Sequence, residues 1–437
     1  MTRAHTILFW PESAAGPTNN CIGIGDRLRR QGHRVVFAAE SSWAGRLDAL
    51  GFEEHLVDLA EPPEGPVDAG QFWKDFIRET APEFRRPTIE QLETVTAPIM
   101  QELIDGSRYA QDRLAAVLDD VHPDVVVEDN VVAFPALLTT GAHFVRLMSC
   151  NPLELRDPLL PPVFSGLPTT DESGWAPFRA EFARTHRSMW EEFDGWVREQ
   201  GAPGLPELEF VHSSASLNLS LYPQIAAYQR STALAPSWQG LDSSVRETDE
   251  PFELPPEVAD GDGALLYLSL GSLGSADVEL MQRLVDALAE SGHRVIVSKG
   301  PRHEEIVLHD RMWGAETVPQ TNVLPHVDLV ITHGGNNTVT ETLHFGKPMV
   351  VLPLFWDQYD NAQRMAEIGA GLRLETYGWD QATLLDGIER LLADHTMRQR
   401  LELDGRRIRS IDGVGVAAAR IAAAAAVDPP PDPVAHT

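Results

Sequence analysis

Short apolar runs separated by helical patterns fill most of the chain. An apolar run over Ile7 to Trp10 precedes a loop rich in Pro, Gly, Ser and Asn over Pro11 to Asn20. A helical pattern then extends to Gln31, where Gly32 ends it, and a second apolar run follows from Arg34 to Ala38. Strands that alternate with helices in this way form a parallel sheet, so the pattern predicts an α/β domain.

The pattern continues, with two interruptions, and then starts again. Further strands of the first series are predicted at 124–128 and 143–149, and a second series at 264–270, 294–298 and 329–332. Long helical stretches that carry many charged and aromatic residues interrupt the first series at 71–121 and 175–200. We therefore predict two facing Rossmann-like domains with a cleft between them, and we expect the two insertions to form walls over one end of the first sheet.

The segment between the two series marks a domain boundary. Residues 242–262 are acidic and rich in proline and show little periodicity, which is typical of a solvated interdomain linker. We predict a first domain over 1–241 and a second over 263–412. The remaining residues, 413–437, form a helix candidate rich in alanine that runs into a proline-rich end, which we expect to be disordered.

Composition narrows the class of protein. The chain has 437 residues, of which 43% are apolar and 23% charged, and no apolar run approaches the roughly 18 residues of a membrane helix. Its first residues lack the features of a secretory signal, so we expect a cytoplasmic protein without membrane insertion. Cys21 and Cys150 lie in apolar segments and are interpreted as buried small side chains, with neither a disulfide nor a metal site implied.

The net charge restricts the partners. A formal charge of -30 would repel nucleic acid and an anionic membrane surface, so a small-molecule ligand is favoured, and the chain is expected to be a monomer or a homodimer. An anionic ligand could bind only where local donors and a helix terminus reverse this field.

One segment has the layout of such an anion site. The apolar strand 327–332 leads through His333 and the pair Gly334 and Gly335 into a predicted helix. The glycines allow a sharp turn and a close approach of the backbone, and the first free N-H groups of the helix would then point at a phosphate. Asn337 and Thr338 add side-chain donors, and His333 adds a donor that can be charged.

This segment resembles the donor signature of glycosyltransferase family 1. The residues that carry the resemblance are His333-Gly334-Gly335-Asn336-Asn337-Thr338 with Glu341, the upstream Val318-Pro319-Gln320, the downstream Pro353-Leu354-Phe355-Trp356-Asp357-Gln358, and Ser269-Leu270-Gly271-Ser272 in the loop that opens the second domain. The order and spacing of the first three agree over about fifty residues. The resemblance implies the GT-B architecture of two facing Rossmann-like domains.

The resemblance also implies roles for particular residues. The diphosphate of a nucleotide sugar would be held by His333, Gly335, Asn337 and Thr338, with Ser272 also facing the phosphates. Glu341 would hold the ribose, and Val318 and Gln320 would lie in the loop that receives the base. Asp357 and Gln358 would hold sugar hydroxyls, which favours a hexose such as glucose.

The catalytic base departs from the family pattern. Enzymes of this type usually carry a histidine before the first helix, and the matching position here is Pro17, which cannot accept a proton. The orienting aspartate of the family corresponds to Asp129, at the end of the strand 124–128, and Asp129 becomes the candidate base. Glu12 and Ser13 are weaker alternatives.

Together these observations predict an inverting, metal-independent transfer of a hexose from a UDP- or TDP-sugar to a hydrophobic natural product such as a macrolide, an ansamycin or a polyphenol. No cofactor is needed beyond the sugar nucleotide, with UDP-glucose favoured, and the paired aspartates of Asp260-Gly261-Asp262 are interpreted as a solvated turn. Phe72 and Trp73 are the candidate acceptor contacts. A catalytically silent nucleotide-sugar-binding protein, indicated by Pro17, and a sugar-nucleotide epimerase stay open.

Overall fold

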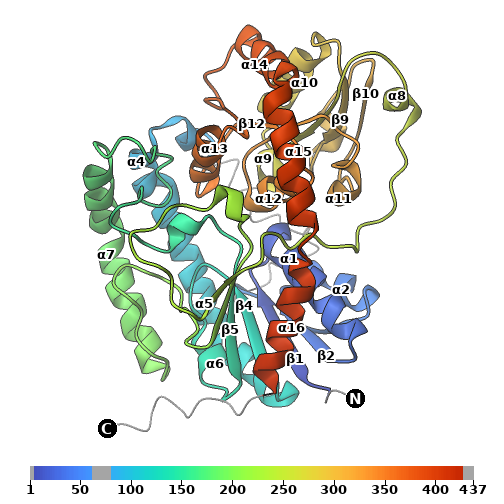
Figure 1. Ribbon diagram of the computed structural model, residues 1–437. Helices are drawn as coiled ribbons and strands as arrows, with labels where there is room; N and C mark the ends of the chain where they lie inside the picture. Colours follow the sequence, from blue (N-terminus) through green and yellow to red (C-terminus); the bar gives the residue numbers. More distant parts are fainter. Residues whose placement is uncertain (1–3, 62–79, 427–437) are drawn as a thin grey trace.

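Two parallel sheets form the framework of the molecule. The computed structural model describes residues 4–61 and 80–426, and Figure 1 shows one sheet in the lower half and the other in the upper half. The first sheet contains β1 (Thr6–Pro11), β2 (Arg34–Ala39), β3 (Glu53–Leu56), β4 (Val125–Asp129), β5 (His143–Met148), β6 (Leu217–Ser220) and β7 (Trp238–Gly240). The second contains β8 (Leu265–Ser269), β9 (Arg294–Ser298), β10 (Met312–Ala315), β11 (Leu329–Thr332), β12 (Met349–Val351) and β13 (Gly371–Arg373). The predicted α/β class with two such sheets is confirmed.

Helices cover the faces of both sheets. The larger helices of the first half are α1 (Ala15–Arg30), α5 (Ala97–Val121) and α7 (Trp175–Glu199), with short turns at α2 (Arg46–Ala49), α4 (Thr88–Gln91) and α6 (Pro135–Leu138). The second half contains α8 (Pro256–Ala259), α9 (Gly271–Gly274), α10 (Val278–Ala289), α11 (Gln320–Val323), α12 (Asn336–His344), α13 (Gln358–Glu367), α14 (Gln381–Ala393), α15 (His395–Arg409) and α16 (Gly413–Ala425).

The strand order places a ligand crevice in each half. The first sheet runs β3-β2-β1-β4-β5-β6-β7 and the second β10-β9-β8-β11-β12-β13, so the order reverses between β1 and β4 and between β8 and β11. In a parallel sheet, ligands bind outside the carboxyl ends of the strands at such a reversal. Pro11 pairs with Asp129 at the first reversal, and Ser269 pairs with Thr332 at the second.

Two local predictions need correction. Helix α1 begins at Ala15, so part of the predicted loop 11–20 is helical, and Pro17 is the third residue of the helix. The first turn of a helix tolerates proline because its N-H groups have no partner within the helix. In the second half, the predicted loop after β8 contains the short helix α9.

The final helix returns to the first sheet. Figure 1 shows α16, at the red end of the chain, lying on the lower sheet beside α1. Its buried residues Ala417, Ala418 and Ile421 join the same core cluster as Ile24 of α1, because small side chains let the two helices approach closely. An ion pair between Arg27 and Asp412 at 2.7 Å joins α1 to the start of α16.

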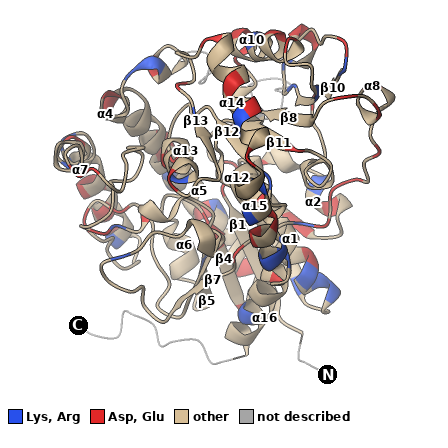
Figure 2. Ribbon diagram, turned by 45° about the horizontal axis from the view of Figure 1, so that its top comes forward, with Lys and Arg blue, Asp and Glu red and all other residues tan. Residues whose placement is uncertain are grey.

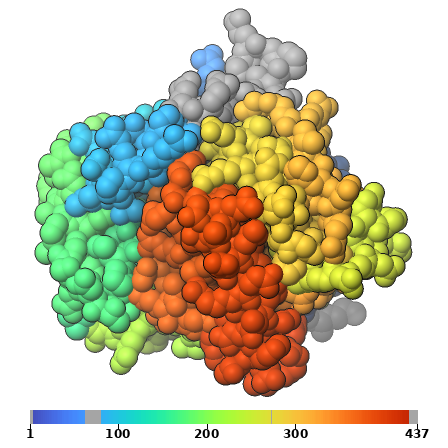
Figure 3. Space-filling view, turned by 90° about the horizontal axis from the view of Figure 1, so that it is seen from above, coloured from blue at the N-terminus to red at the C-terminus, as the bar shows by residue number. Residues whose placement is uncertain are grey.

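The two halves touch through the first insertion. In the view of Figure 3, the light-blue segment of the first half lies against the orange part of the second half. Phe84 stacks on Phe355 with ring centroids 5.2 Å apart, and Gln91 Nε2 donates to the Tyr359 hydroxyl at 2.9 Å. These contacts hold the carboxyl ends of the two sheets together.

Acidic residues, red on the ribbon of Figure 2, are distributed over the helices of both halves, in agreement with the net charge of -30. Among the described helices, none combines the length and the hydropathy needed to cross a membrane.

Replacing Ile421 by Ala tests the packing of α16. The Ile421 side chain is fully buried, so its truncation should lower the free energy of unfolding by about 2–5 kcal/mol through lost burial and a residual cavity. Urea unfolding followed by circular dichroism measures the change, with the exposed Arg420→Ala as the matched control. Equal midpoints for the two variants would contradict the packing described.

Candidate active site

A glycine turn aims the amino end of α12 into the second crevice. Gly334 has φ of +87°, and a Cβ there would lie 2.7 Å from Val351 Cγ1, so only glycine fits. A Cβ on Gly335 would lie 2.5 Å from His333 Nε2, so the imidazole packs against bare backbone. No side chain caps the helix, which leaves its first amide hydrogens free for an anion.

The His333 ring is neutral in this turn. Burial lowers the pKa of His333 to about 4, although a backbone hydrogen bond at Ser269 partly opposes this. This value predicts a neutral ring near neutral pH in the absence of a bound anion, and a nearby negative charge would raise the pKa again. The single N-H of the neutral ring is engaged by the Ser269 backbone, so donation from His333 to an anion requires the second proton.

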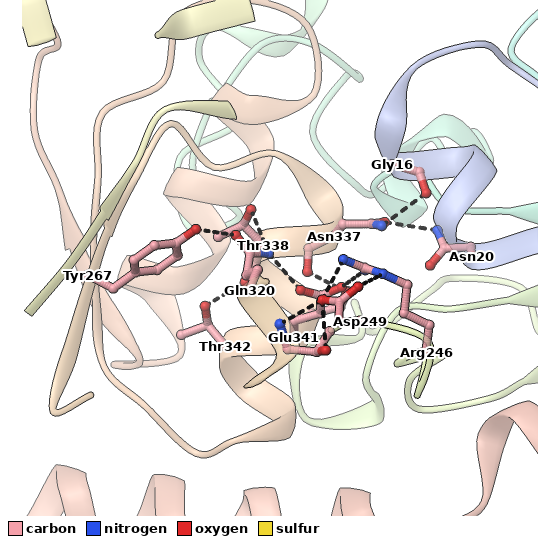
Figure 4. Close-up of polar contacts among 12 residues, drawn as sticks. Gly16, Asn20, Arg246, Asp249, Tyr267, Gln320, Asn337, Thr338, Glu341 and Thr342 are labelled. Carbon is pink, nitrogen blue, oxygen red and sulfur yellow. Dashed lines mark hydrogen bonds and ion pairs between the residues drawn. The ribbon is translucent and has the colours of Figure 1, made fainter. Parts of the chain in front are cut away.

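Three of the predicted donor residues meet beside this turn. Gln320 Nε2 donates to Glu341 Oε2 at 2.6 Å and to Thr338 Oγ1 at 3.4 Å, and the Tyr267 hydroxyl donates to Gln320 Oε1 at 3.2 Å. Figure 4 shows these side chains pointing toward one another from β8, α11 and α12. Glu341 is 3% exposed, and burial raises its pKa above the ordinary value.

Two members of this cluster are not among the donor residues predicted from the sequence. Arg246 Nη1 lies 2.9 Å from Glu341 Oε1, and Asp249 accepts from Arg246 Nε at 2.7 Å and from Nη2 at 3.0 Å. Both residues belong to the segment 242–262, which was interpreted as solvated, yet their side chains are only 12% exposed. The alternation of charges in Arg246-Glu247-Thr248-Asp249 carries no periodic signal that could have indicated burial.

Asn337 joins the two halves. Its Nδ2 donates to the Gly16 carbonyl at 3.0 Å, and its Oδ1 accepts from Asn20 Nδ2 at 2.9 Å. Figure 4 shows Asn337 between α12 and the start of α1. The amino ends of these two helices therefore face each other across the cleft.

Asp357 and Gln358 lie at the start of α13. Asp357 Oδ2 accepts from the Asn151 amide at 2.9 Å, and burial raises the pKa of Asp357 to about 6. Gln358 Oε1 accepts from the amides of Leu354 and Phe355, so this oxygen shapes its own loop. Asp357 also lines a pocket between the two halves, whereas the side-chain oxygen of Gln358 is engaged by backbone amides of its own loop.

Asp129 lies at the first reversal, buried and only partly hydrogen-bonded. Ser149 donates to its Oδ1 from the hydroxyl at 2.9 Å and from the amide at 3.3 Å, and Oδ2 has no partner among the described residues. Burial raises the pKa of Asp129 to about 7, and the nearby carboxylates of Glu12 and Glu154 act in the same direction. A carboxylate with one unengaged oxygen and such a pKa is suited to accept a proton near neutral pH.

Glu12 adds a second carboxylate to this end of the sheet. Its amide donates to the Asp129 carbonyl at 2.9 Å, and burial raises the pKa of Glu12 to about 7. Two such groups side by side disfavour simultaneous ionisation, so their titrations are coupled.

One pocket between the two halves is lined in part by Asp357. It is a narrow pocket with a cavity volume of about 50 Å³, and its walls come from α5, α7 and loops of both halves. The lining includes Met100, Phe164, Phe182, Phe210, Trp356 and Asp357. The expectation that the two insertions contribute walls agrees with Met100 of α5 and Phe182 of α7.

The remaining predicted residues are placed less directly. Phe72 and Trp73 lie outside the described residues, and of Ser272 only the position in α9 is described. Val318 lies in the loop before α11 and is partly buried against the hydrophobic core.

Comparisons with known proteins agree with this geometry. Residues 246–402 match the model of the UDP-glucoronosyl and UDP-glucosyl transferase family. The chain is 25% identical to demethyllactenocin mycarosyltransferase of Streptomyces fradiae, over 94% of this chain and 85% of that one. It is 29% identical to vancomycin aglycone glucosyltransferase of Amycolatopsis orientalis, over 84% and 85%. The solved glycosyltransferase VinC in complex with DTDP superposes with a TM-score of 0.66 at 18% identity, over 96% and 99%.

The buried carboxyl of Asp129 should destabilise the fold as pH rises. Its pKa is about 7 when folded and near 4 when unfolded, so the penalty is absent below pH 4, grows between these values and is complete above pH 7. Asp129→Asn removes this penalty. The stability of the variant relative to the wild type should therefore increase by roughly 2–3 kcal/mol between pH 5 and pH 8.

Chemical unfolding of both proteins at the two pH values measures this difference. The exposed Asp119→Asn is the control and should show no pH-dependent difference. A relative stability of Asp129→Asn that falls with rising pH would show that the carboxyl is not desolvated.

Proposed function

Because this chain is a glycosyltransferase of the family 1 type with the GT-B fold, we propose that it transfers a hexose from a UDP- or TDP-sugar to a hydrophobic natural product with inversion at the anomeric carbon. The donor lies against the second domain and the acceptor against the first. Glucose is the favoured sugar, and the acceptor is a polyphenol, macrolide or ansamycin type of molecule.

The turn before α12 supports the binding of the diphosphate. The amide of Gly335 and the free amides of α12 present neutral donors and a helix dipole, which suit an anion inside a molecule of net charge -30, and His333 adds a donor when it is protonated. These donors also stabilise the charge that develops when the nucleoside diphosphate leaves. Thr338 and Asn337 lie in the first turn of the same helix.

The neighbouring side chains support the rest of the donor. Glu341 accepts hydrogen bonds from the ribose hydroxyls, and the loop with Val318 and Gln320 receives the base. Asp357 and Gln358 hold sugar hydroxyls from the start of α13. The Asp357 carboxylate at the pocket edge favours a sugar that retains its hydroxyls, as glucose does.

Asp129 acts as the base in this proposal. The acceptor oxygen attacks the anomeric carbon from the face opposite the diphosphate, the bond to the diphosphate oxygen breaks, and Oδ2 of Asp129 takes the proton of the acceptor hydroxyl. A base with a pKa near 7 is matched better to a phenol, of pKa about 10, than to an alkyl alcohol. The aromatic walls of the pocket favour a flat apolar acceptor body.

One chain of contacts carries the proposal. Asn336 Nδ2, in the first turn of α12, donates to the Ser149 carbonyl, and the Ser149 hydroxyl donates to Asp129. The candidate base and the candidate diphosphate site thus share a single intervening residue. This arrangement sets a proton acceptor beside an anion site, which a displacement at the sugar carbon requires.

Incubation with labelled UDP-glucose or TDP-glucose and a panel of polyphenols, macrolides and ansamycins tests the proposed reaction. A glycosylated product whose anomeric configuration is opposite to that of the donor supports it. Release of an altered sugar nucleotide would instead indicate epimerisation, and binding without turnover of any acceptor would indicate a silent binder.

Replacing Asp129 by Asn should lower kcat by about 10²- to 10⁴-fold while UDP or TDP affinity stays unchanged. In the wild type, kcat/KM should rise with pH and level off above about 7, because the base must be ionised. Steady-state rates across pH measure both effects, with Asp119→Asn as the control. Undiminished turnover in Asp129→Asn would reject Asp129 as the base.

Replacing Gly335 by Ala should weaken UDP and TDP binding by at least about tenfold, which is roughly 1.4 kcal/mol. The added Cβ would clash with the His333 ring, and the clash would move the ring and the Gly335 amide away from the phosphate. Calorimetric titration measures the affinity. Gly195→Ala is the matched control, because a Cβ there meets nothing within 4 Å.

A further inference from the structure

An arginine from the segment between the domains lies inside the candidate nucleotide site. Arg246 Nη1 contacts Glu341 Oε1 at 2.9 Å, and its other two nitrogens contact both oxygens of Asp249. Neither Arg246 nor Asp249 belongs to the motif that indicated the donor site. Figure 4 shows the guanidinium directly over the Glu341 carboxylate.

Asp249 fixes the position of this arginine. Its Oδ2 also accepts from the amide and the hydroxyl of Thr321, at 3.2 and 2.9 Å, and Asn322 Nδ2 donates to the Asp249 carbonyl at 3.2 Å. The segment is therefore attached to α11, whose first residue, Gln320, holds the other oxygen of Glu341. The carboxylate of Glu341 is clamped from two sides by elements that are themselves fastened together.

Helix α1 of the first domain supports the opposite side of the segment. A Cβ on Gly23 would lie 3.2 Å from Arg246 Cβ, so the arginine backbone is packed closely against α1. This packing fixes the backbone from which the side chain reaches Glu341. An exposed ion pair in a flexible linker would have no such support.

The clamp leaves binding capacity on Glu341. An ionised carboxylate has about four lone-pair positions, and here one on each oxygen is engaged, by Arg246 and by Gln320. One position on each oxygen is left for a hydroxyl donor. Two neighbouring hydroxyls of a ribose match this pair of free positions.

We propose that Arg246 is a positioning residue of the donor site, which keeps the Glu341 carboxylate ionised and oriented toward the ribose of the nucleotide, with Asp249 holding Arg246 in place. The proposal rests on the proposed function, because it assigns Glu341 to the ribose. It extends the donor site to the segment that joins the domains.

The electrostatics of the site support this role. Burial raises the pKa of Glu341, and Asp249 acts in the same direction, whereas Arg246 and Gln320 oppose the rise. Tyr267 is the other titratable group that faces Glu341, and burial keeps it neutral by raising its pKa. Without Arg246, Glu341 would take up a proton at a higher pH and lose an acceptor for the ribose.

The decisive variant is Arg246→Met, which removes the charge and the donors but keeps an apolar stem. Calorimetric titration with UDP and with TDP at pH 6.0, 7.0 and 8.5, each compared with the wild type, should show affinity about tenfold or more weaker at pH 6.0. The deficit should shrink at pH 8.5, because Glu341 ionises again. The donor KM should rise while kcat stays within about threefold.

Three further variants separate positioning from mere stability. Arg246→Lys should recover part of the affinity, since it retains the charge. Glu341→Gln should bind weakly at every pH, and Arg246→Met combined with Glu341→Gln should be no weaker than Glu341→Gln alone. Glu247→Gln is the control, because Glu247 is exposed and lies 3.9 Å from Arg30 rather than in the site.

Thermal unfolding of each variant identifies any loss of folded protein. Should Arg246→Met fold poorly, the combination Arg246→Met with Asp249→Asn removes the unpaired Asp249 carboxylate and should show the same pH-dependent loss. Unchanged affinity in a folded Arg246→Met would overturn the proposal, and so would a loss that is equal at all three pH values. Tighter binding would overturn it too, by showing that Arg246 blocks the site. A wild type that binds neither UDP nor TDP would overturn the proposed function itself.

Discussion

The structure depends on one electrostatic constraint: an anion site must exist inside a strongly acidic molecule. With 65 acidic and 35 basic residues, the general field repels a phosphate group. In our proposal, the turn at Gly334 and Gly335 meets this constraint through the uncapped amides of α12. The amides of a helix terminus keep their polarity when they are buried, whereas a lysine there would lose solvation.

Burial in the cleft then sets the chemistry on both sides. It raises the pKa values of Asp129, Glu12 and Asp357 and lowers that of His333, so the groups near the reacting atoms shift toward their neutral forms. For Asp129 the shift costs stability, and in our proposal it provides a base that works near neutral pH. For Glu341 the same burial would be harmful, and in our proposal Arg246 counteracts it. In our proposal, burial therefore helps Asp129 to act as a base but would weaken hydroxyl binding by Glu341. The Arg246 guanidinium beside Glu341 makes the difference, because it opposes the rise in pKa there.

The sequence predicted the fold and the donor motif because both are local patterns. Strands such as β1, β4, β8 and β11 are continuous apolar runs, and the glycine turn lies within a few residues of the side chains it serves. The short edge strands β3, β7 and β13 escaped prediction, because their mixed residues give no period. Arg246 escaped because its role comes from a contact with Glu341, 95 positions along the chain. The position of Ser149 between Asp129 and Asn336 likewise exists only once the two sheets face each other.

The substitution of Pro17 for the usual histidine becomes understandable in this geometry. Residue 17 lies in the first turn of α1, beside Gly16, whose carbonyl binds Asn337 of the second domain. Proline fits this turn, so the position serves the contact between α1 and α12 even though it holds no base. Among the described residues, the hydrogen bonds to the Asp129 carboxylate come from Ser149 and none comes from α1. The hydrogen bonds that hold the candidate base therefore do not involve residue 17. With proline at this position, the Asp129 carboxylate is still held through Oδ1, and its Oδ2 has no hydrogen-bond partner among the described residues.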